Sequence, residues 1–267
     1  AILNADDHLV ADMANQTSGN IIFYSLEGKT NIVIKEHLKS GGTAVIFEDG
    51  EFCVMKGKWK YPLVEAKDVP ITFDGKARFN IANVLASIGA AIGIGVKNEN
   101  ITASLTTFFP SYSQTPGRLT MQDMGSFKVL VDFAHNVAGY DGLAEFVISL
   151  NPVNTIATLC LPGDRRVEDF ENVAKIAAAT YDQIILFEGF LRGKKQGYIS
   201  ETLKIYLLKH GMNKNKIEII LNEHDAVQFA LDSAKDGDLI VLSNYDIKGI
   251  HERIADHKEM LEKQVTR

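Results

Sequence analysis

Polar and charged side chains cluster around one apolar strand pattern in the middle of the sequence. Thr115 to Leu119 reads TPGRL, and Leu130 to Tyr140 reads LVDFAHNVAGY. Asp132 lies inside or at the end of an apolar run, where a carboxylate without a partner costs free energy. It therefore needs a partner such as a ribose hydroxyl, Arg118 or a backbone N–H. Arginine offers a planar fork of donors that suits ribose or phosphate oxygens, and His135 can donate to an anion. These residue types indicate a nucleotide site.

Four polar or glycine-containing loops follow predicted strands in the second half of the chain. In a parallel sheet, ligands bind beyond the carboxyl ends of the strands, so we expect these loops to lie on one rim. Such loops are polar in any case, and Arg165 and Arg166 could equally be a solvated pair and Asp164 a helix cap. The four loops are residues 134–136 (AHN), 162–166 (PGDRR), 189–195 (GFLRGKK) and 244–249 (NYDIKG).

The elements that must position these loops alternate regularly. Continuous apolar strands separated by amphipathic helices are typical of a mostly parallel sheet covered on both faces. The stretch FPSYSQTPG that precedes them reads as a linker, so we place a domain boundary at 114/115. The predicted strands are 128–133, 155–161, 183–188, 217–221 and 238–243, and the predicted helices lie near 139–150, 167–180, 197–210, 224–234 and 247–263.

The first 114 residues follow a different pattern. A short strand, a helix that begins with acidic residues and a second strand lead into a β-meander between Gly42 and Pro70, where apolar and polar residues alternate around tight glycine turns. A helix rich in small residues, expected to be buried, follows at 78–95. A short helix then begins near Asn100.

Two stretches resemble ligand motifs without matching them. EGKT ends like a phosphate-binding P-loop, but the motif needs a glycine five residues before Gly28, where Phe23 stands. We read EGKT as a turn. His251 and His257 are six residues apart, whereas a zinc-binding helix spaces two histidines by four, so HERIADH indicates a surface helix.

Composition bounds the remaining possibilities. The chain has 267 residues, 46% hydrophobic and 23% charged, with a net charge of −6. Ordinary globular composition with scattered Lys and Arg argues against a nucleic-acid binder, and no apolar run is long enough to span a membrane. Cys53 and Cys160 lie in apolar runs and read as buried thiols of a cytoplasmic protein. Because the sequence opens at Ala1 within a strand pattern, we expect a fragment of a longer protein.

The ordered set of motifs resembles the Mur ligase family, most closely its cyanophycin-synthetase branch. Phe133 and Val137 depart from the tyrosine and proline usual in that branch. The resemblance implies an α/β fold in which residues 1–114 are the C-terminal part of the central ATPase domain, without its P-loop. Residues 115–267 are then a Rossmann-like C-terminal domain with a mostly parallel sheet. The motifs are LNADD (3–7), FNIANVLAS (79–87), SQTPGR (113–118), VDFAHN (131–136) and PGDRRVEDF (162–170), with LRGKKQG (191–197) as a further similarity.

Residue roles follow from the resemblance by position. It implies ATP and Mg²⁺ as cofactors, with the P-loop, the metal ligands and a family lysine expected upstream of Ala1, and no metal ligand in this chain. Asn4 and Asp7 match a segment that supports the nucleotide pocket. The implied catalytic residues are Arg118, Asp132 and His135. The implied nucleotide-binding residues are Asn80, Asn83, Arg118, Asp132 and His135, and the implied substrate-binding residues are Asn136, Asp164 and Arg165.

The implied reaction is ATP-dependent amide or isopeptide bond formation through an acyl phosphate. In the cyanophycin branch, arginine is added to an aspartate side-chain carboxylate of a growing polymer, and acidic rim residues are hypothesised to attract arginine: Asp164, Glu168, Asp169 and Glu188. Alternatives are a Mur-type ligase for cell-wall or folate-type substrates, or a non-catalytic module that binds nucleotide or a partner. We expect the isolated chain to be inactive without the missing N-terminal part of its parent. Homo-oligomerisation stays possible, and neither nucleic acid nor membrane is expected as a partner.

Overall fold

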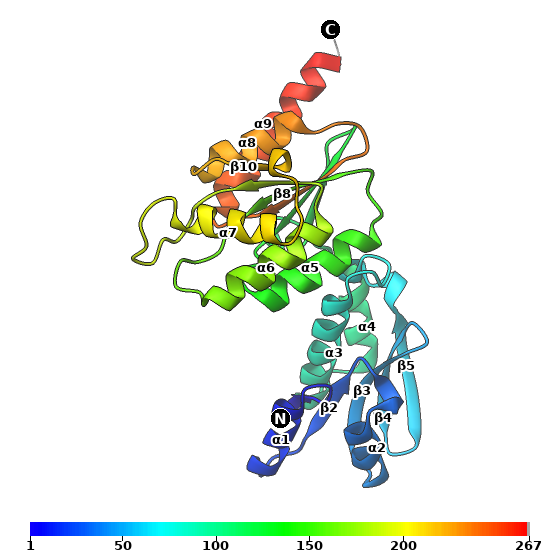
Figure 1. The fold of residues 1–267 in the computed structure, drawn as a ribbon. Coiled ribbons are helices and arrows are strands. Elements are labelled where there is room, and N and C mark those ends of the chain that lie inside the picture. The colour runs from blue at the N-terminus through cyan, green and yellow to red at the C-terminus, as the bar shows by residue number, and fades with distance from the viewer. Residues whose placement is uncertain (266–267) are drawn as a thin grey trace. The chain divides into compact units, whose positions relative to one another are not determined.

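The computed structural model describes residues 1–265 and divides into two compact units, Ala1–Phe109 and Pro110–Arg267 (Figure 1). We call them the N-terminal unit and the C-terminal unit and describe each by itself. The domain boundary placed at 114/115 from the sequence lies a few residues further along the chain, inside the C-terminal unit.

The N-terminal unit is built on a five-stranded mixed sheet of order β1-β2-β3-β4-β5. The first three strands are parallel, and the last two add an antiparallel meander, as the alternating pattern predicted. Its strands are β1 (Ile2–Asn4), β2 (Ile22–Ser25), β3 (Thr43–Glu48), β4 (Glu51–Lys56) and β5 (Trp59–Glu65). Its α-helices are α1 (His8–Asp12), α2 (Ile32–Lys39), α3 (Arg78–Gly93) and α4 (Asn98–Thr107), and short 3₁₀ turns cover Met13–Gln16, Gly28–Thr30, Ala66–Asp68 and Pro70–Thr72.

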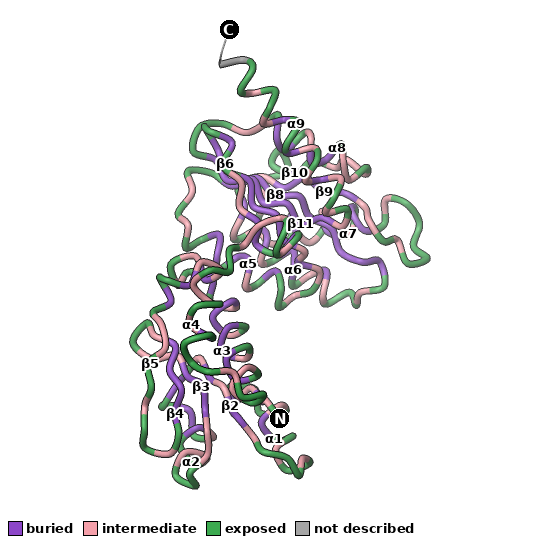
Figure 2. Tube along the Cα trace, turned by 180° about the vertical axis from the view of Figure 1, so that it is seen from behind, coloured by how far each residue is buried: buried purple, intermediate pink, exposed green. Residues whose placement is uncertain are grey.

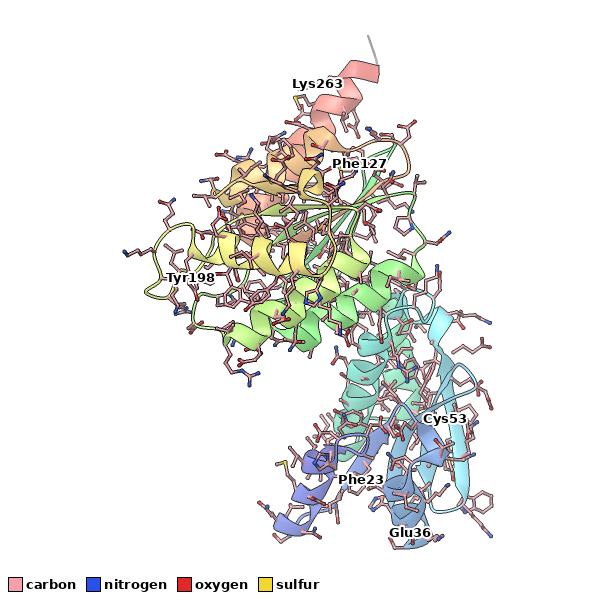
Figure 3. All side chains as sticks on the ribbon, viewed as in Figure 1. Phe23, Glu36, Cys53, Phe127, Tyr198 and Lys263 are labelled. Carbon is pink, nitrogen blue, oxygen red and sulfur yellow. The ribbon has the colours of Figure 1, made fainter. Side chains whose placement is uncertain are left out.

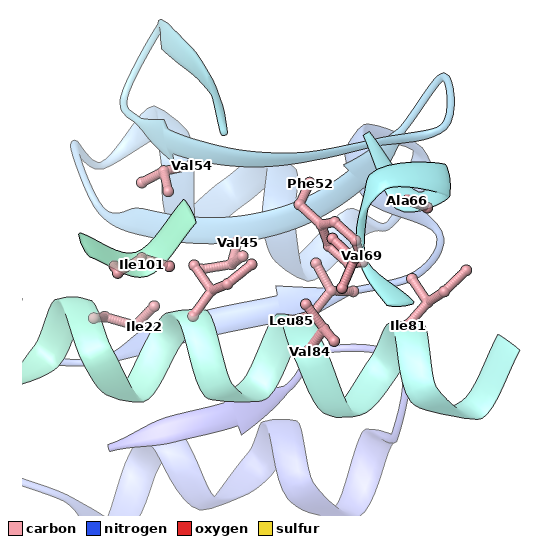
Figure 4. Packing of buried hydrophobic residues seen from close by; sticks show 11 residues of the cluster. Ile22, Val45, Phe52, Val54, Ala66, Val69, Ile81, Val84, Leu85 and Ile101 are labelled. Atoms are coloured by element: carbon pink, nitrogen blue, oxygen red, sulfur yellow. The ribbon is translucent and has the colours of Figure 1, made fainter. Parts of the chain in front are cut away.

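Two apolar clusters fill the two sides of this sheet. Successive side chains of a strand point to opposite faces, so Val45 of β3 packs toward α3 and α4, whereas Ala44 and Ile46 pack toward α1 and α2. Figure 4 shows the first cluster, in which Val45 and Leu85 meet between sheet and helix. One strand therefore supplies both cores, and burial is concentrated along the strands (Figure 2).

The C-terminal unit is built on a six-stranded sheet of order β10-β9-β8-β11-β7-β6. All neighbours are parallel except the edge pair β6 and β7, which confirms the mostly parallel sheet. Its strands are β6 (Thr120–Asp123), β7 (Lys128–Asp132), β8 (Thr155–Leu159), β9 (Gln183–Leu186), β10 (Ile217–Ile219) and β11 (Leu239–Ser243). Its helices are α5 (Val137–Ser149), α6 (Val167–Thr180), α7 (Tyr198–Lys209), α8 (Glu223–Ser233) and α9 (Ile247–Val265), with a 3₁₀ turn at Lys214–Lys216.

Helices cover both faces of this second sheet. Figure 1 shows α5, α6 and α7 side by side on one face, with α8 and α9 on the other. The chain therefore leaves β7, β8 and β9 toward one face, and leaves β10 and β11 toward the opposite face. In the sheet, β11 lies between β7 and β8, and β10 lies beside β9. At these places the chain leaves neighbouring strands toward opposite faces of the sheet. These are the switch points where ligands of such sheets bind.

One helix and one strand were not predicted from the sequence. α2 begins where the Asn31 side chain accepts from the N–H groups of Val33 and Ile34; this cap overrides a run rich in β-branched residues. β6 is a short strand that pairs only with β7. The stretch HERIADH lies in the helix α9, within which His257 is buried and its Nδ1 lies 3.3 Å from the side-chain nitrogen of Gln228.

Candidate active site

Asp132 ends β7 as a buried carboxylate. Its Oδ2 accepts a hydrogen bond from the backbone N–H of Leu119 at 3.1 Å, and its side chain is 8% exposed. Burial raises the pKa of Asp132 to about 6, although the Leu119 N–H and the charge of Arg118 favour the ionised form. Of the partners considered from the sequence, the structure therefore supplies a backbone N–H.

Arg118 and His135 both lie against the ring of Phe133, and the charges of both act on the neighbouring Asp132; we call these residues the β7 corner. The Arg118 guanidinium carbon lies 5.3 Å from the Phe133 ring centre, and the His135 ring lies 5.4 Å from it. His135 Nδ1 is 3.0 Å from the carbonyl oxygen of Phe133. A carbonyl only accepts, so Nδ1 carries the proton and Nε2 is left to accept a proton or, in the imidazolium, to donate one. Three predicted site residues are thus brought together.

The three predicted substrate residues are placed differently. The Asn136 side chain caps α5 by accepting from the Gly139 N–H at 2.8 Å. Asp164 is exposed in the loop after β8. Arg165 is half-buried, and its Nε is sealed from solvent without a hydrogen-bond partner. Among these three, Arg165 is the one with a buried donor that has no hydrogen-bond partner.

The predicted residues of the N-terminal unit take up local structural contacts. The Asn80 amide is buried, donates to the Ile71 carbonyl at 2.8 Å and accepts from Asn83 at 3.2 Å. Asn4 accepts from the Asp6 N–H, and Asp7 caps α1. Asn83, by contrast, is exposed.

Two of the acidic rim residues already have partners. Asp169 forms an ion pair of 2.7 Å with Arg166 at the start of α6. Glu188 accepts from the backbone N–H groups of Gly197, Ile199 and Ser200 and so caps α7. Both side chains stabilise helix starts, which leaves the exposed Asp164 and Glu168 as the free acids of that set.

A cleft of about 570 Å³ opens beyond the carboxyl ends of β9, β10 and β11. We call it the β9–β11 cleft. It combines three carboxylates, a histidine and two aromatic rings. Its lining side chains include Glu188, Phe190, Glu223, His224, Tyr245 and Asp246. The cleft is therefore suited to a small ligand that carries positive charge.

Glu223 holds the wall of this cleft in place. Its Oε1 accepts from the Asn244 side chain at 3.1 Å and from the backbone N–H groups of Tyr245 and Asp246 at 2.5 and 3.2 Å. Asn244 is itself buried and accepts from Thr158 of β8 at 2.8 Å. A chain of hydrogen bonds thus fixes the loop after β11 to the neighbouring strand.

The loop of residues 189–197, which contributes Gly189, Phe190 and Gln196 to the cleft lining, is cationic. Arg192, Lys194 and Lys195 are all exposed. The Arg192 guanidinium lies 5.1 Å from the Phe190 ring, and Lys194 Nζ lies 4.8 Å from the ring of Tyr198, which stands at the start of α7 (Figure 3). The cleft therefore offers groups for a cation and, beside them, groups for a carboxylate.

Sequence reasoning placed polar loops after β9 and β11, and of their cleft residues it singled out only Glu188, as an acidic rim residue. It missed entirely the loop after β10, which contributes Glu223 and His224. The available signal was the sequence LNEHD directly after the last residues of a predicted strand, the same position that had made the other loops notable.

The fold and the family of the chain are defined by its similarities. The structure resembles a pseudomurein peptide ligase type C from Methanothermus fervidus, with a TM-score of 0.61, 18% identity and coverage of 96% of this chain and 56% of that chain. It also resembles folylpolyglutamate synthase of Mycobacterium tuberculosis, complexed with ADP and AMPPCP, with a TM-score of 0.56, 16% identity and coverage of 92% and 59%. The fold is thus that of the Mur-type ligases.

Sequence similarity carries the assignment further. Residues 117–243 match the family described as Mur ligase, glutamate ligase domain. The chain is 38% identical over 247 residues to a cyanophycin synthetase of Nostoc sp. strain PCC 7120, a match that covers 91% of this chain and 27% of that protein. Residues 117–243 thus belong to the Mur ligase family, as the motifs predicted, and the chain spans about a quarter of the length of the cyanophycin synthetase that it matches.

Within residues 1–265, no helix combines the length and the apolar content that crossing a membrane requires. In the same range, no group of three or more His, Cys, Asp and Glu side chains is arranged to hold a metal ion.

Proposed function

We propose that the chain is part of an ATP-dependent amide ligase of the cyanophycin-synthetase type, which adds arginine to the side-chain carboxylate of aspartate. One observation carries the proposal: the β7 corner and the β9–β11 cleft stand at the carboxyl edge of the same sheet. The first has the residue types of a nucleotide site, and the second has the charges of a site for a cationic amino acid. The similarity to cyanophycin synthetase supports this choice of substrate.

The β7 corner fits the sugar and phosphate of a nucleotide by the chemistry of its donors and acceptors. Asp132, when ionised, accepts from hydroxyl groups, and the exposed Arg118 donates to oxygens. His135 contributes Nε2, because Nδ1 is held by the Phe133 carbonyl. We propose Asn136, Asp164 and Arg165 as substrate-binding residues of the C-terminal unit, and Asn80 and Asn83 as nucleotide-binding residues of the N-terminal unit.

The β9–β11 cleft fits arginine better than a glutamate-type substrate. Glu188, Glu223 and Asp246 give it a negative interior, which favours a guanidinium and disfavours a second carboxylate. The face of Phe190 or Tyr245 offers a surface on which a guanidinium can stack. Arg192 at the cleft edge is then available for the α-carboxylate of the amino acid.

The residues of this chain act by binding and orientation. ATP with Mg²⁺ supplies the phosphoryl group that turns the acceptor carboxylate into an acyl phosphate; the metal ligands are proposed to lie outside this chain. The cleft holds arginine by its guanidinium and its carboxylate, so that the neutral α-amine is directed at the acyl carbon. The new amide bond replaces the bond from that carbon to the phosphate oxygen, and inorganic phosphate leaves. Arg118 stabilises negative charge on transferred oxygens. His135 Nε2 is available to take up a proton released near the corner.

The test uses the complete protein encoded with this chain, ATP, Mg²⁺ and a peptide primer that ends in aspartate. Phosphate release and primer extension are measured with arginine, glutamate and meso-diaminopimelate in parallel. We expect extension with arginine alone. Extension with glutamate or diaminopimelate in its place would reassign the chain to a cell-wall or folate-type ligase. Nucleotide binding without any extension would favour a binding module.

Asp246→Asn should raise the KM for arginine about tenfold, which corresponds to about 1.4 kcal/mol. Asp246 is ionised under assay conditions, because the Gly249 N–H and His224 hold its pKa below the usual range. The asparagine oxygen still accepts from Gly249, so the change removes mainly the charge. Steady-state kinetics on the complete protein measures the effect.

Glu168→Gln is the matched control for Asp246→Asn. It removes one exposed carboxylate from the rim outside the β9–β11 cleft and should leave the KM for arginine unchanged. A larger effect from Glu168 than from Asp246 would restore the rim hypothesis and reject the cleft.

A further inference from the structure

A continuous row of aromatic rings joins the β7 corner to the β9–β11 cleft. Phe133 and Tyr245 are 5.6 Å apart and nearly perpendicular, and Tyr245 and Phe190 are 4.7 Å apart. A guanidinium caps each end: Arg118 lies over Phe133 at 5.3 Å, and Arg192 lies over Phe190 at 5.1 Å. We call Phe133, Tyr245 and Phe190 the ring row.

The ring row crosses the switch point of the sheet. Its members follow β7, β11 and β9, and β11 lies between β7 and β8 in the sheet. Tyr245 is the central member because it contacts both other rings. It also contacts Phe187 at 6.2 Å, which flanks it from the end of β9.

The position of Tyr245 is tightly determined. Its backbone N–H is held by Glu223 at 2.5 Å, and its ring lies so close to Gly189 that an added Cβ there would come within 2.3 Å of Tyr245 Cδ2. The Tyr245 ring is therefore held in one position between the loop after β9 and the loop after β11. In so dense a cluster, displacement of one ring displaces its neighbours.

The ring of Tyr245, rather than its hydroxyl, makes these contacts. The hydroxyl is sealed from solvent, lies near the Cys160 thiol and has no hydrogen bond of ordinary geometry. A phenylalanine would keep every ring contact of the row, and a leucine would break the row at its centre.

We propose that Tyr245 is a positioning residue that couples the two ligands: it holds Phe133 beneath Arg118 and Phe190 beneath Arg192, so that nucleotide at the corner raises the affinity of the cleft for its amino acid. The proposal rests on the proposed function for the identity of the two ligands. Coupling of this kind is reciprocal, and typical factors are about 5- to 150-fold.

The experiment measures that factor in the complete protein. Calorimetry gives the dissociation constant of ADP with and without saturating arginine, for wild type, Tyr245→Leu, Tyr245→Phe and Tyr206→Leu. We expect a factor of about 5 or more in wild type and about 1 in Tyr245→Leu. Tyr245→Phe should recover the factor, since it keeps the ring. Tyr206→Leu makes the same change on α7, outside the ring row, and should keep it.

Several results would overturn the role of Tyr245. These are a wild-type factor of 1, a Tyr245→Leu variant that retains the factor, or a Tyr245→Phe variant that loses it. Repeating the titration with glutamate and diaminopimelate separates the two proposals. Coupling through Tyr245 with one of these in place of arginine would reject the substrate and keep the positioning role.

If ADP does not bind, the role of Tyr245 can be tested in the ligand-free protein by NMR. The Nε–H resonances of Arg118 and Arg192 report the rings beneath them. Tyr245→Leu should shift both, although Arg118 stacks on Phe133 and not on Tyr245 itself. A shift confined to Arg192 would show that the ring row transmits nothing and would overturn the inference.

Discussion

Asp132→Asn should make the C-terminal unit more stable at pH 7 and, at the same time, lower ligase activity at least tenfold. The stability change follows from burial, which raises the pKa of Asp132 to about 6, whereas an unfolded aspartate titrates near about 3.9. The pKa of Asp132 thus differs by about two units between the folded and unfolded states, and at about 1.4 kcal/mol per unit this changes the free energy of unfolding by about 3 kcal/mol. The folded state binds the extra proton, so this stability is fully present below about pH 4 and is lost as the pH rises through 6.

Asparagine retains an oxygen for the Leu119 N–H and cannot ionise. We therefore expect a gain approaching about 2–3 kcal/mol at pH 8 and almost none at pH 4. Urea unfolding at several pH values, followed through amide signals of β7 and β11, reports this unit separately from the other. Asp123→Asn is the control, because that carboxylate is exposed at the end of β6. If Asp132→Asn lowered the free energy of unfolding by the same amount at every pH, the interpretation of Asp132 as a buried carboxylate kept for function would be wrong.

The predicted loss of activity has a separate cause. A neutral amide cannot replace a carboxylate that accepts from hydroxyl groups and balances Arg118 in the β7 corner. A variant that is more stable and less active is the signature of a residue retained for function at the expense of stability. Full activity with raised stability would mean that Asp132 serves only the Leu119 contact.

Gly163→Ala should displace the loop at residues 189–193 and raise the KM for the amino acid more than tenfold. A Cβ on Gly163 would lie 2.1 Å from the Leu191 carbonyl oxygen, and the Gly163 N–H donates to the Phe190 carbonyl at 2.9 Å. The obstacle is backbone and not a flexible side chain, so one loop must move. That movement shifts Phe190 and Arg192 together at the edge of the cleft.

Gly193→Ala is the matched control in the same loop. Gly193 has a φ of 83°, with nothing within 4 Å of its added Cβ, so alanine there brings only backbone strain of about 1–2 kcal/mol. Hydrogen exchange of residues 189–193 should accelerate strongly in Gly163→Ala and weakly in Gly193→Ala. Wild-type exchange and wild-type KM in Gly163→Ala would show that the contact between the two loops is not needed.

Periodicity in the sequence predicted most elements of the fold because local composition encodes them. Apolar strands and amphipathic helices of the C-terminal unit, and the meander of the N-terminal unit, each carry their own pattern. Asp132 drew attention for a physical reason that needs no structure: a carboxylate in an apolar strand must have a partner. α2 was not predicted because its β-branched residues favour a strand. β6 was not predicted because four residues are too few to show a hydrophobic period.

The acidic rim shows where a sequence stops being informative. Glu188 and Glu168 look alike as acids near strand ends, yet Glu188 caps α7 with three backbone contacts whereas Glu168 is exposed. The two residues differ in the backbone N–H groups that lie within hydrogen-bonding distance of their carboxylates, and tertiary packing places those of residues 197–200 next to Glu188.

By itself the sequence determined the family, the alternating α/β order and the clustering of Arg118, Asp132 and His135 on either side of β7. Only the tertiary structure decided that Tyr245 stands between Phe133 and Phe190, and that three separate loops enclose one cleft. The reason is strand order: β11 is the last strand in sequence but pairs between β7 and β8. Such long-range pairing depends on how whole strands pack, which no local pattern records.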